Sequence, residues 1–152
     1  IMCNAATPVP VDSIEQNNDG GFTGDEIEIK AFFTDPANID NYYLFEIHTP
    51  TLITPDFDAY KDEFVDGNQI FSLYSDEDLE SGDEIVIRNY GVTERFYEFM
   101  FLLLLQTETD GGPFQTQPAT VRGNCVNITN SANFPLGYFR VSQAFETTYT
   151  IE

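Results

Sequence analysis

The chain has 152 residues, of which 26 are acidic and six are basic, so its formal net charge is −20. Nucleic acids and anionic lipids are poor partners for such a chain, because both require a basic surface. The sequence has no run of about 18 apolar residues, which excludes a membrane-spanning helix. One domain covering 1–152 fits this length, and 14 Phe with 8 Tyr and no Trp favour strands over helices.

The first ten residues, IMCNAATPVP, lack the basic and apolar regions of a signal peptide, so we expect a processed or excised piece of a longer protein. The two cysteines, Cys3 and Cys125, would close a long loop if they were bonded. A disulfide and a pair of inert buried thiols both fit the sequence.

Residues 15–26, EQNNDGGFTGDE, carry oxygen-bearing side chains at the spacing of an EF-hand calcium loop. The matching positions are held by Glu15, Asn17, Asp19, Gly20, Thr23 and Glu26. The first position of such a loop normally carries Asp, and the residues on either side of this stretch resemble strands rather than helices. We therefore expect a turn between strands, with a Ca²⁺ site as the less favoured alternative.

Residues 26–34, EIEIKAFFT, alternate between apolar and polar side chains, which is typical of a half-buried strand. One face carries Ile27, Ile29, Ala31 and Phe33. A turn rich in Asp, Pro and Asn follows, and 41–49, NYYLFEIHT, resume as an aromatic strand. We predict that these two strands are neighbours in one antiparallel sheet.

Residues 50–68 are predicted to be irregular, because Pro and a cluster of acidic residues interrupt any periodicity. Asp66-Gly67 marks a turn into a strand that begins near residue 68. A solvated acidic connection at 75–83 leads to a further strand at 84–90. Short strands at this spacing predict a β-sandwich.

The stretch 93–107 is predicted to form a helix, since it reads TERFYEFMFLLLLQT and contains no Gly, Pro, Asn or Asp. Thr93 can cap its amino end, and Glu94 suits the first turn. Because apolar side chains almost encircle this helix, we expect it to be mostly buried against the sheet. Membrane insertion is disfavoured, since the apolar run is short and glutamates interrupt it.

The end of the chain contains two further signals. Gly137, which precedes Tyr138, predicts a bulge or a close approach of two backbones. Residues 146–152, ETTYTIE, alternate as a terminal strand should.

Catalytic chemistry has little support in the sequence. His48 is the only histidine, so a zinc site built on imidazoles and a histidine-dependent triad lack their other members. A pair of carboxylates could act as in glycosidases, but 26 acidic residues produce many pairs by chance. Short glycosylation motifs occur at 12–14 and 127–129, and both are common by accident. We expect a protein that is not an enzyme.

Six pieces of the chain resemble, in order, the carboxy-terminal part of an uncharacterised family of Bacteroidota outer-membrane lipoproteins. The pieces are VDSI, GDEIEIKAFFTDPANIDNYYLFEI, DEFVDGN, SGDEIVIRNYGVTERFYEFM, GGPFQTQPATVRGNCVNITN and FPLGYFRVSQ. The resemblance covers nearly everything after residue 11, and its most specific elements are PF and P, then GN, then LGYF.

This resemblance implies an extracytoplasmic protein, anchored in the outer membrane through an upstream lipidated segment and often encoded beside TonB-dependent receptors. Cys3 lacks a preceding lipobox and is not the anchor. The implied role is to capture or hand over a nutrient at the cell surface. The family has no established catalytic residue, so the resemblance assigns none here.

Together these observations predict an antiparallel immunoglobulin-like β-sandwich with one inserted helix at about 93–107. We expect a non-enzymatic accessory or binding module that works with a TonB-dependent receptor or another surface protein, a glycan or a small nutrient. A calcium-dependent adhesin or glycan-binding module is the alternative.

Ligand contacts are expected in the loops at 50–68, 75–83 and 108–118. The candidate contact residues in these loops are Phe57, Tyr60, Phe64 and Phe114. Anchoring of the loops by these rings is the simpler explanation.

Overall fold

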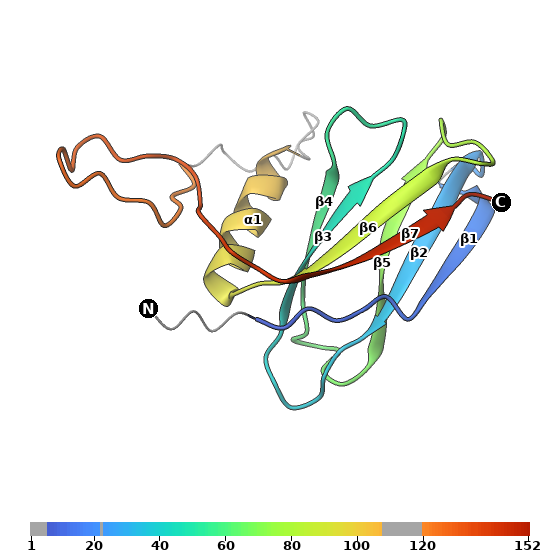
Figure 1. Ribbon diagram of the computed structural model, residues 1–152, viewed down its shortest axis with the longest axis horizontal. Coiled ribbons are helices and arrows are strands. Elements are labelled where there is room, and N and C mark those ends of the chain that lie inside the picture. The colour runs from blue at the N-terminus through green and yellow to red at the C-terminus, as the bar shows by residue number, and fades with distance from the viewer. Residues whose placement is uncertain (1–5, 22, 108–119) are drawn as a thin grey trace.

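The structure, a computed structural model, describes residues 6–21, 23–107 and 120–152, which form seven strands and one helix (Figure 1). In chain order these are β1 (Ser13–Gly20), β2 (Glu26–Thr34), β3 (Tyr42–His48), β4 (Asp56–Lys61), β5 (Gln69–Asp76), β6 (Glu84–Gly91), α1 (Glu94–Thr107) and β7 (Ala144–Thr150).

The strands form two antiparallel sheets, with the orders β1-β2-β5 and β4-β3-β6-β7. This confirms the predicted antiparallel β-sandwich of immunoglobulin-like type. Compared with a constant-type immunoglobulin domain, the fourth strand joins the sheet of the third rather than that of the first two. The helix α1 is inserted between β6 and β7, where the sequence predicted it.

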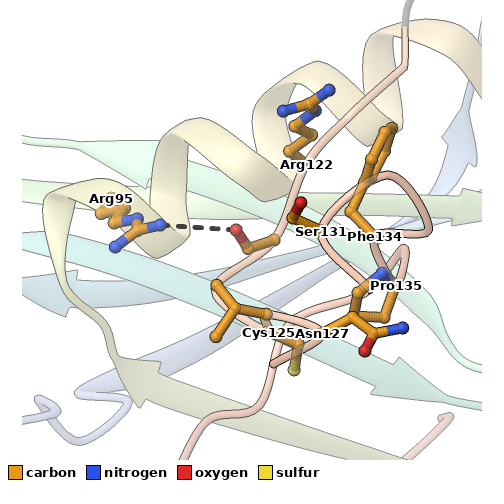
Figure 2. Close-up of a pocket in the computed structure, with 9 residues that line it drawn as sticks. Arg95, Arg122, Cys125, Asn127, Ser131, Phe134 and Pro135 are labelled. Atoms are coloured by element: carbon orange, nitrogen blue, oxygen red, sulfur yellow. Dashed lines mark hydrogen bonds between the residues drawn. The ribbon is translucent and has the colours of Figure 1, made fainter. Parts of the chain in front are cut away.

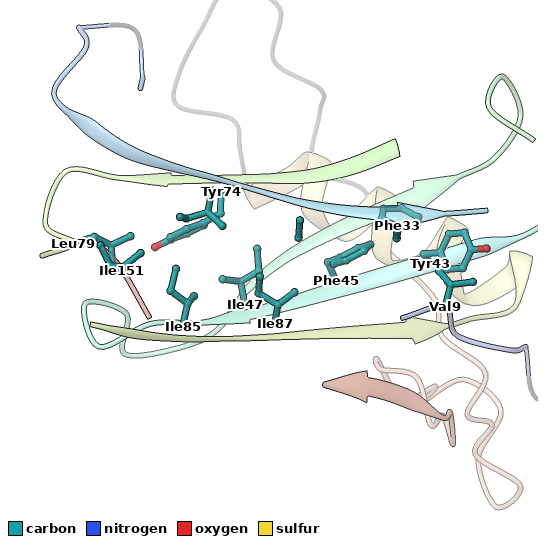
Figure 3. Packing of buried hydrophobic residues seen from close by; sticks show 12 residues of the cluster. Val9, Phe33, Tyr43, Phe45, Ile47, Tyr74, Leu79, Ile85, Ile87 and Ile151 are labelled. Carbon is teal, nitrogen blue, oxygen red and sulfur yellow. The ribbon is translucent and has the colours of Figure 1, made fainter. Parts of the chain in front are cut away.

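The core lies between the two sheets and is built largely from rings and β-branched side chains (Figure 3). Phe33 on β2 packs edge-on to Tyr43 with 5.3 Å between ring centroids, and against Phe45 at 4.9 Å. Ile85 and Ile87 of β6 are also almost completely buried. The face of β2 that alternation predicted to be apolar is therefore the face that fills this core.

The prediction that β2 and β3 pair with each other is wrong. β2 pairs with β1 and β5, whereas β3 pairs with β4 and β6. The connection between them crosses from one sheet to the other, and buried Asp35 fixes this crossing by accepting a 2.6 Å hydrogen bond from the Tyr43 hydroxyl. Alternation shows which side of a strand is buried but not which strand lies beside it.

The described residues of the calcium-like stretch, 15–21 and 23–26, form most of β1, turn residues and the first residue of β2, as the turn alternative predicted. Gly21 and Gly24 adopt positive φ angles of 71° and 77° in this turn, which glycine tolerates best. Strand β1 is longer than the sequence indicated, since it continues through Asn17 to Gly20.

The prediction of an irregular 50–68 is also wrong in part, because β4 lies within it. β4 is an edge strand, and its sequence DFDAYK lacks the apolar density of the buried strands. It separates a loop at 49–55 from a loop at 62–68, which lie at opposite ends of the sandwich (Figure 1). The predicted turn at Asp66-Gly67 and the terminal strand are both confirmed.

Candidate functional site

The helix α1 begins where the sequence predicted. The Thr93 hydroxyl accepts a hydrogen bond of 3.3 Å from the Phe96 amide, and its carbonyl accepts bonds of 2.9 Å from the amides of Phe96 and Tyr97. These contacts satisfy amide groups that have no partner inside the helix. Glu94 places a negative charge at the positive end of the helix dipole.

One side of α1 packs on the outer face of the four-stranded sheet, away from the sandwich core. Phe96 is buried there beside Leu44 of β3 and Val92, and Tyr97 lies 5.5 Å from Tyr42 between ring centroids. The sheet thus has two covered faces at this position. The residues between α1 and the sheet form a second, smaller hydrophobic cluster. Composition and periodicity did not distinguish this cluster from the core between the two sheets.

The other side of α1 is exposed, so the prediction of a mostly buried helix is wrong. Phe96 is its only buried residue, while Phe101, Leu102 and Leu103 keep 43%, 50% and 39% of their surface accessible. A sheet covers only the side of a helix that faces it, and nothing in the described part of the chain lies over the far side. No described helix is long and apolar enough to cross a bilayer.

Residues 120–143 form an extended segment that runs beside α1 and projects from the sandwich (Figure 1). Its base is closed by Asn124, whose amide group donates a 2.7 Å hydrogen bond to the Phe139 carbonyl and accepts one of 2.8 Å from the Phe139 amide. At Gly123 a Cβ atom would lie 1.5 Å from the Gly137 carbonyl oxygen. The close backbone approach predicted at Gly137 is therefore confirmed, with Gly123 as its partner.

This closure joins the GN and LGYF elements of the family resemblance, which lie 12 residues apart between Asn124 and Leu136. Gly137 also has a positive φ of 125°, which other residues rarely adopt. We call 123–139 the neck loop. The contact between the GN and LGYF elements gives both a structural role, without any need for catalysis.

Arg140 attaches the end of this segment to the sandwich. Its guanidinium lies 4.4 Å from the ring centroid of Tyr90 and 4.5 Å from that of Phe96. Burial lowers the pKa of Arg140, although the neighbouring Tyr90 and Glu46 oppose this shift. Cation–π contacts with two rings compensate in part for the lost hydration.

The exposed side of α1 and residues 120–143 together form what we call the apolar lobe surface. Nine of the 16 exposed large apolar side chains among the described residues lie there. They are Phe101, Leu102, Leu103, Val126, Ile128, Phe134, Leu136, Phe139 and Val141. Exposed apolar surface concentrated in this way is typical of a binding surface.

The hollows beside this surface include the following three. One of about 560 Å³ lies between Phe99 and Leu103 of α1 and Leu136 of the neck loop. Another of about 510 Å³ lies on the opposite flank of the helix, against Tyr42 and Lys61. The third, of about 360 Å³, lies where the neck loop meets the start of α1 (Figure 2).

A polar network that the sequence did not reveal lies on the outer face of the four-stranded sheet. Glu46 accepts hydrogen bonds from His48 at 2.5 Å, Arg88 at 3.1 Å and Tyr90 at 2.8 Å. Burial raises the pKa of Glu46, but the hydrogen bonds outweigh it and hold the pKa below its usual value. Arg88 also pairs with Glu146 of β7 at 2.8 Å. The network joins three adjacent strands and thereby supports the sheet.

An acidic cluster lies at the end of the sandwich that carries the 35–41 and 62–68 connections. Oxygens of Asp35, Asp62 and Asp66 all lie within 4.8 Å of one another. Asp35 and Asp62 are buried and accept hydrogen bonds, Asp35 from Gly67 at 3.2 Å and Asp62 from Asn41 at 2.8 Å. These bonds hold the two connections together, which is a sufficient structural role for the carboxylates.

The three predicted contact residues that the structure describes do not converge. Phe57 is half-buried beneath α1, and Tyr60 packs in the core 5.6 Å from Phe45. Phe64 is 90% exposed at the opposite end of the sandwich from the loop at 49–55. Phe114 lies outside the described residues. For Phe57 and Tyr60, which are on β4 rather than on a loop, packing explains the side chain without a ligand.

The predicted metal ligands are spread along a strand. Glu15, Asn17 and Asp19 occupy alternate positions of β1, so about 14 Å of extended chain separates the first from the last. Glu26 begins the next strand, opposite Gly20. This spacing suits a hairpin better than a single ion. Cys125 is an exposed free cysteine, and Cys3 lies outside the described residues, so the disulfide stays a prediction.

The comparison with protein families gives a match over residues 2–148 to a domain of unknown function, DUF4249. The chain belongs to the DUF4249 family. The match spans β1 to β6, α1, the neck loop and most of β7, so the arrangement described above lies within the DUF4249 domain except for the last residues of β7. No curated protein and no solved structure matches this chain.

Proposed function

We propose that the protein is a non-enzymatic accessory or binding module at the bacterial cell surface. It would belong to an outer-membrane lipoprotein of Bacteroidota and assist a TonB-dependent receptor in nutrient uptake. The resemblance of the sequence supports the setting, and the apolar lobe surface supports the role. That surface is the single observation on which the proposal depends.

The chemistry of the apolar lobe surface favours a protein partner. Its rings and aliphatic side chains lie beside Arg95 and Arg122, and aromatic residues and Arg are enriched in protein interfaces. An anionic bilayer is a poor alternative, since the chain carries a net charge of −20. We therefore assign the surface to an exposed protein face of the receptor.

The titratable groups support a binding role over a reaction. Glu46 accepts hydrogen bonds from His48 and Arg88 on the face of a sheet, and none of the three residues lines the three hollows. A general acid or base must reach a bound substrate. This arrangement favours a structural use of the network.

Affinity purification of the full-length, membrane-anchored protein tests the proposal. The wild type and an Ile53→Asp control, in which an exposed residue of the 49–55 loop is changed, should both recover the receptor. A Leu102→Asp/Leu103→Asp variant should lose it, because two charges would be buried in the contact. Recovery of the wild type without any receptor would contradict the proposal. If the double variant still recovers the receptor, Leu102 and Leu103 of α1 are not part of the contact.

The acidic cluster is the one observation in favour of the alternative, a calcium-dependent adhesin or glycan-binding module. Carboxylate oxygens are the ligands that Ca²⁺ prefers. Calorimetric titration of the wild type with Ca²⁺ decides between the two functions. The comparison variant is Asp66→Asn, because Asp66 is the exposed member of the cluster. Heat of binding and a higher melting temperature in the wild type, both absent in the variant, would favour the alternative. Neither signal at millimolar Ca²⁺ would remove it.

A further inference from the structure

The smallest of the three hollows differs from the rest of the molecule in charge. It is lined by Arg95, Arg122, Gly123, Cys125, Val126, Asn127, Ser131, Phe134 and Pro135. Two of these side chains are cationic, and none of the described lining residues is acidic. In a chain with 26 acidic and six basic residues, a hollow with this lining is unexpected.

The two arginines lack the ion pairs that three other cations of the chain have. Lys30, Lys61 and Arg88 each lie within 4.0 Å of a carboxylate. Within the described residues, neither Arg95 nor Arg122 has such a partner. Both therefore keep donors for a ligand.

One acidic side chain, Glu98, lies near the two arginines. Glu98, one turn along α1 from Arg95, lines an adjoining hollow with both arginines but forms an ion pair with neither. It lowers the positive charge around the two guanidinium groups without occupying their hydrogen-bond donors.

The neck loop holds both groups in place. Arg95 donates a 3.4 Å hydrogen bond to the Gly123 carbonyl (Figure 2), which leaves its other N–H groups available. The guanidinium of Arg122 lies 3.8 Å from the ring centroid of Phe134. Stacking fixes the plane of a guanidinium and leaves the donors on its edge for a carboxylate or phosphate.

Part of the remaining wall is apolar. Val126, Phe134 and Pro135 line the same hollow as the arginines, together with the polar Asn127 and Ser131. A volume of about 360 Å³ lies at the lower end of small-molecule sites. The lining thus combines two cations and two neutral polar side chains with an apolar surface.

We propose that this hollow binds the anionic oxygen group of a small molecule that also carries an apolar part, most simply an organic carboxylate. Arg95 and Arg122 would hold the oxygens, and Phe134 with its neighbours would hold the apolar part. The site goes beyond receptor docking and does not depend on it, although Val126 and Phe134 of the apolar lobe surface also line the hollow.

Titration of the whole chain with three probes, monitored through its amide chemical shifts by NMR, tests the site. They are phenylacetate, its neutral analogue phenylacetamide, and inorganic phosphate. We expect phenylacetate to shift amides of residues 123–135 with a dissociation constant on the order of 1 mM, and phenylacetamide to bind at least about tenfold more weakly. Phosphate binding as tight as that of phenylacetate would assign the site to the oxygen group alone, and weaker phosphate binding would assign it to organic carboxylates.

Variants separate the site from general charge. Arg95→Gln/Arg122→Gln should weaken phenylacetate binding at least about tenfold, whereas Lys30→Gln should leave it unchanged. Lys30 is the matched control because it also lies over a ring, that of Phe71, at 5.5 Å. A second variant, Arg122→Lys, keeps the charge and should retain part of the affinity. An unchanged melting temperature shows that each variant folds.

Three results would overturn the proposal. They are no response to phenylacetate or phosphate, equal binding of the acid and the amide, and unchanged binding by the double variant. Receptor recovery with that variant is measured in parallel. Because the two assays have separate readouts, loss of anion binding with retained receptor, or the reverse, identifies which proposal has failed.

Discussion

The two hydrophobic clusters of this protein lie on opposite faces of the same four-stranded sheet and differ in how completely their side chains are buried. Between the sheets, Phe33 and Phe45 are completely buried. On the outer face, α1 buries Phe96 and leaves Phe101 and Leu103 exposed. Both regions are rich in large apolar side chains, so composition does not separate them.

The difference shows which apolar residues stabilise the fold and which remain available for contact. A side chain enclosed by two sheets contributes its full transfer free energy to folding. One that stays half-exposed on α1 contributes part of it and keeps the remainder for a partner. The sandwich is thus the stable support, and α1 with residues 120–143 is the region that presents a surface.

The largest expected effect comes from a matched pair of ring deletions. Phe45→Ala should lower the free energy of unfolding by about 3–5 kcal/mol, because it opens a cavity in the core. Phe101→Ala should lower it by less than about 1 kcal/mol, because its ring is 43% exposed. Urea denaturation measures both. Equal losses would abolish the distinction between the two regions.

The second effect concerns the crossing between the sheets. Tyr43→Phe removes the hydrogen bond to Asp35 and leaves a buried carboxylate without that donor, which should cost about 2 kcal/mol. Tyr42→Phe on the outer face is the control, and denaturant midpoints give the comparison. A small loss of stability for Tyr43→Phe would show that the hydrogen bond between Tyr43 and Asp35 is not needed to hold the crossing.

The third effect depends on pH. The folded pKa of Glu46 lies below its usual value of 4.5, so Glu46 stabilises the fold above that pH and the contribution is lost as pH falls through the folded pKa. Glu46→Gln should cost about 1 kcal/mol at neutral pH. The difference between variant and wild type should shrink on acidification, as thermal melts at several pH values would show. A constant difference would mean that the charge of Glu46 is not involved.

The smallest effect on global stability is expected at the neck. Gly123→Ala would force a Cβ atom into the Gly137 carbonyl, which should open the neck loop while the core persists. Amide hydrogen exchange should accelerate at Phe139 and remain slow at Phe45. Gly82→Ala tests backbone strain without a clash, because Gly82 has a positive φ of 98° and no atom lies within 4 Å of its Cβ site. This control should leave exchange at Phe139 unchanged. Unchanged exchange at Phe139 would show that the closure tolerates a side chain.

Much of the sandwich was predictable because its signals are local. Alternation in 26–34 gave the buried side of β2, and Thr93 gave the start of α1. Strand β4 was missed because DFDAYK is short and acidic, as edge strands often are. The pairing of β2 with β5 instead of β3 was missed because a turn of seven residues fits a hairpin and a crossing equally well.

The candidate sites were less predictable. Phe57 and Tyr60 were expected in a loop and lie on a strand, where both rings pack. Arg95 and Arg122 are 27 positions apart and carry no shared motif. The GN and LGYF elements could each be recognised in the sequence, but the contact between them could not be predicted from it.

The sequence by itself determined the alternating strands, the helix start, the acidic charge and the membership of the family, because these depend on residue order and composition. Only the tertiary structure decided the partner of each strand, the exposed side of α1, the closure of the neck and the position of two arginines around one hollow. The physical reason is that periodicity records a residue's local direction, whereas burial and contact depend on chain segments that are distant in sequence.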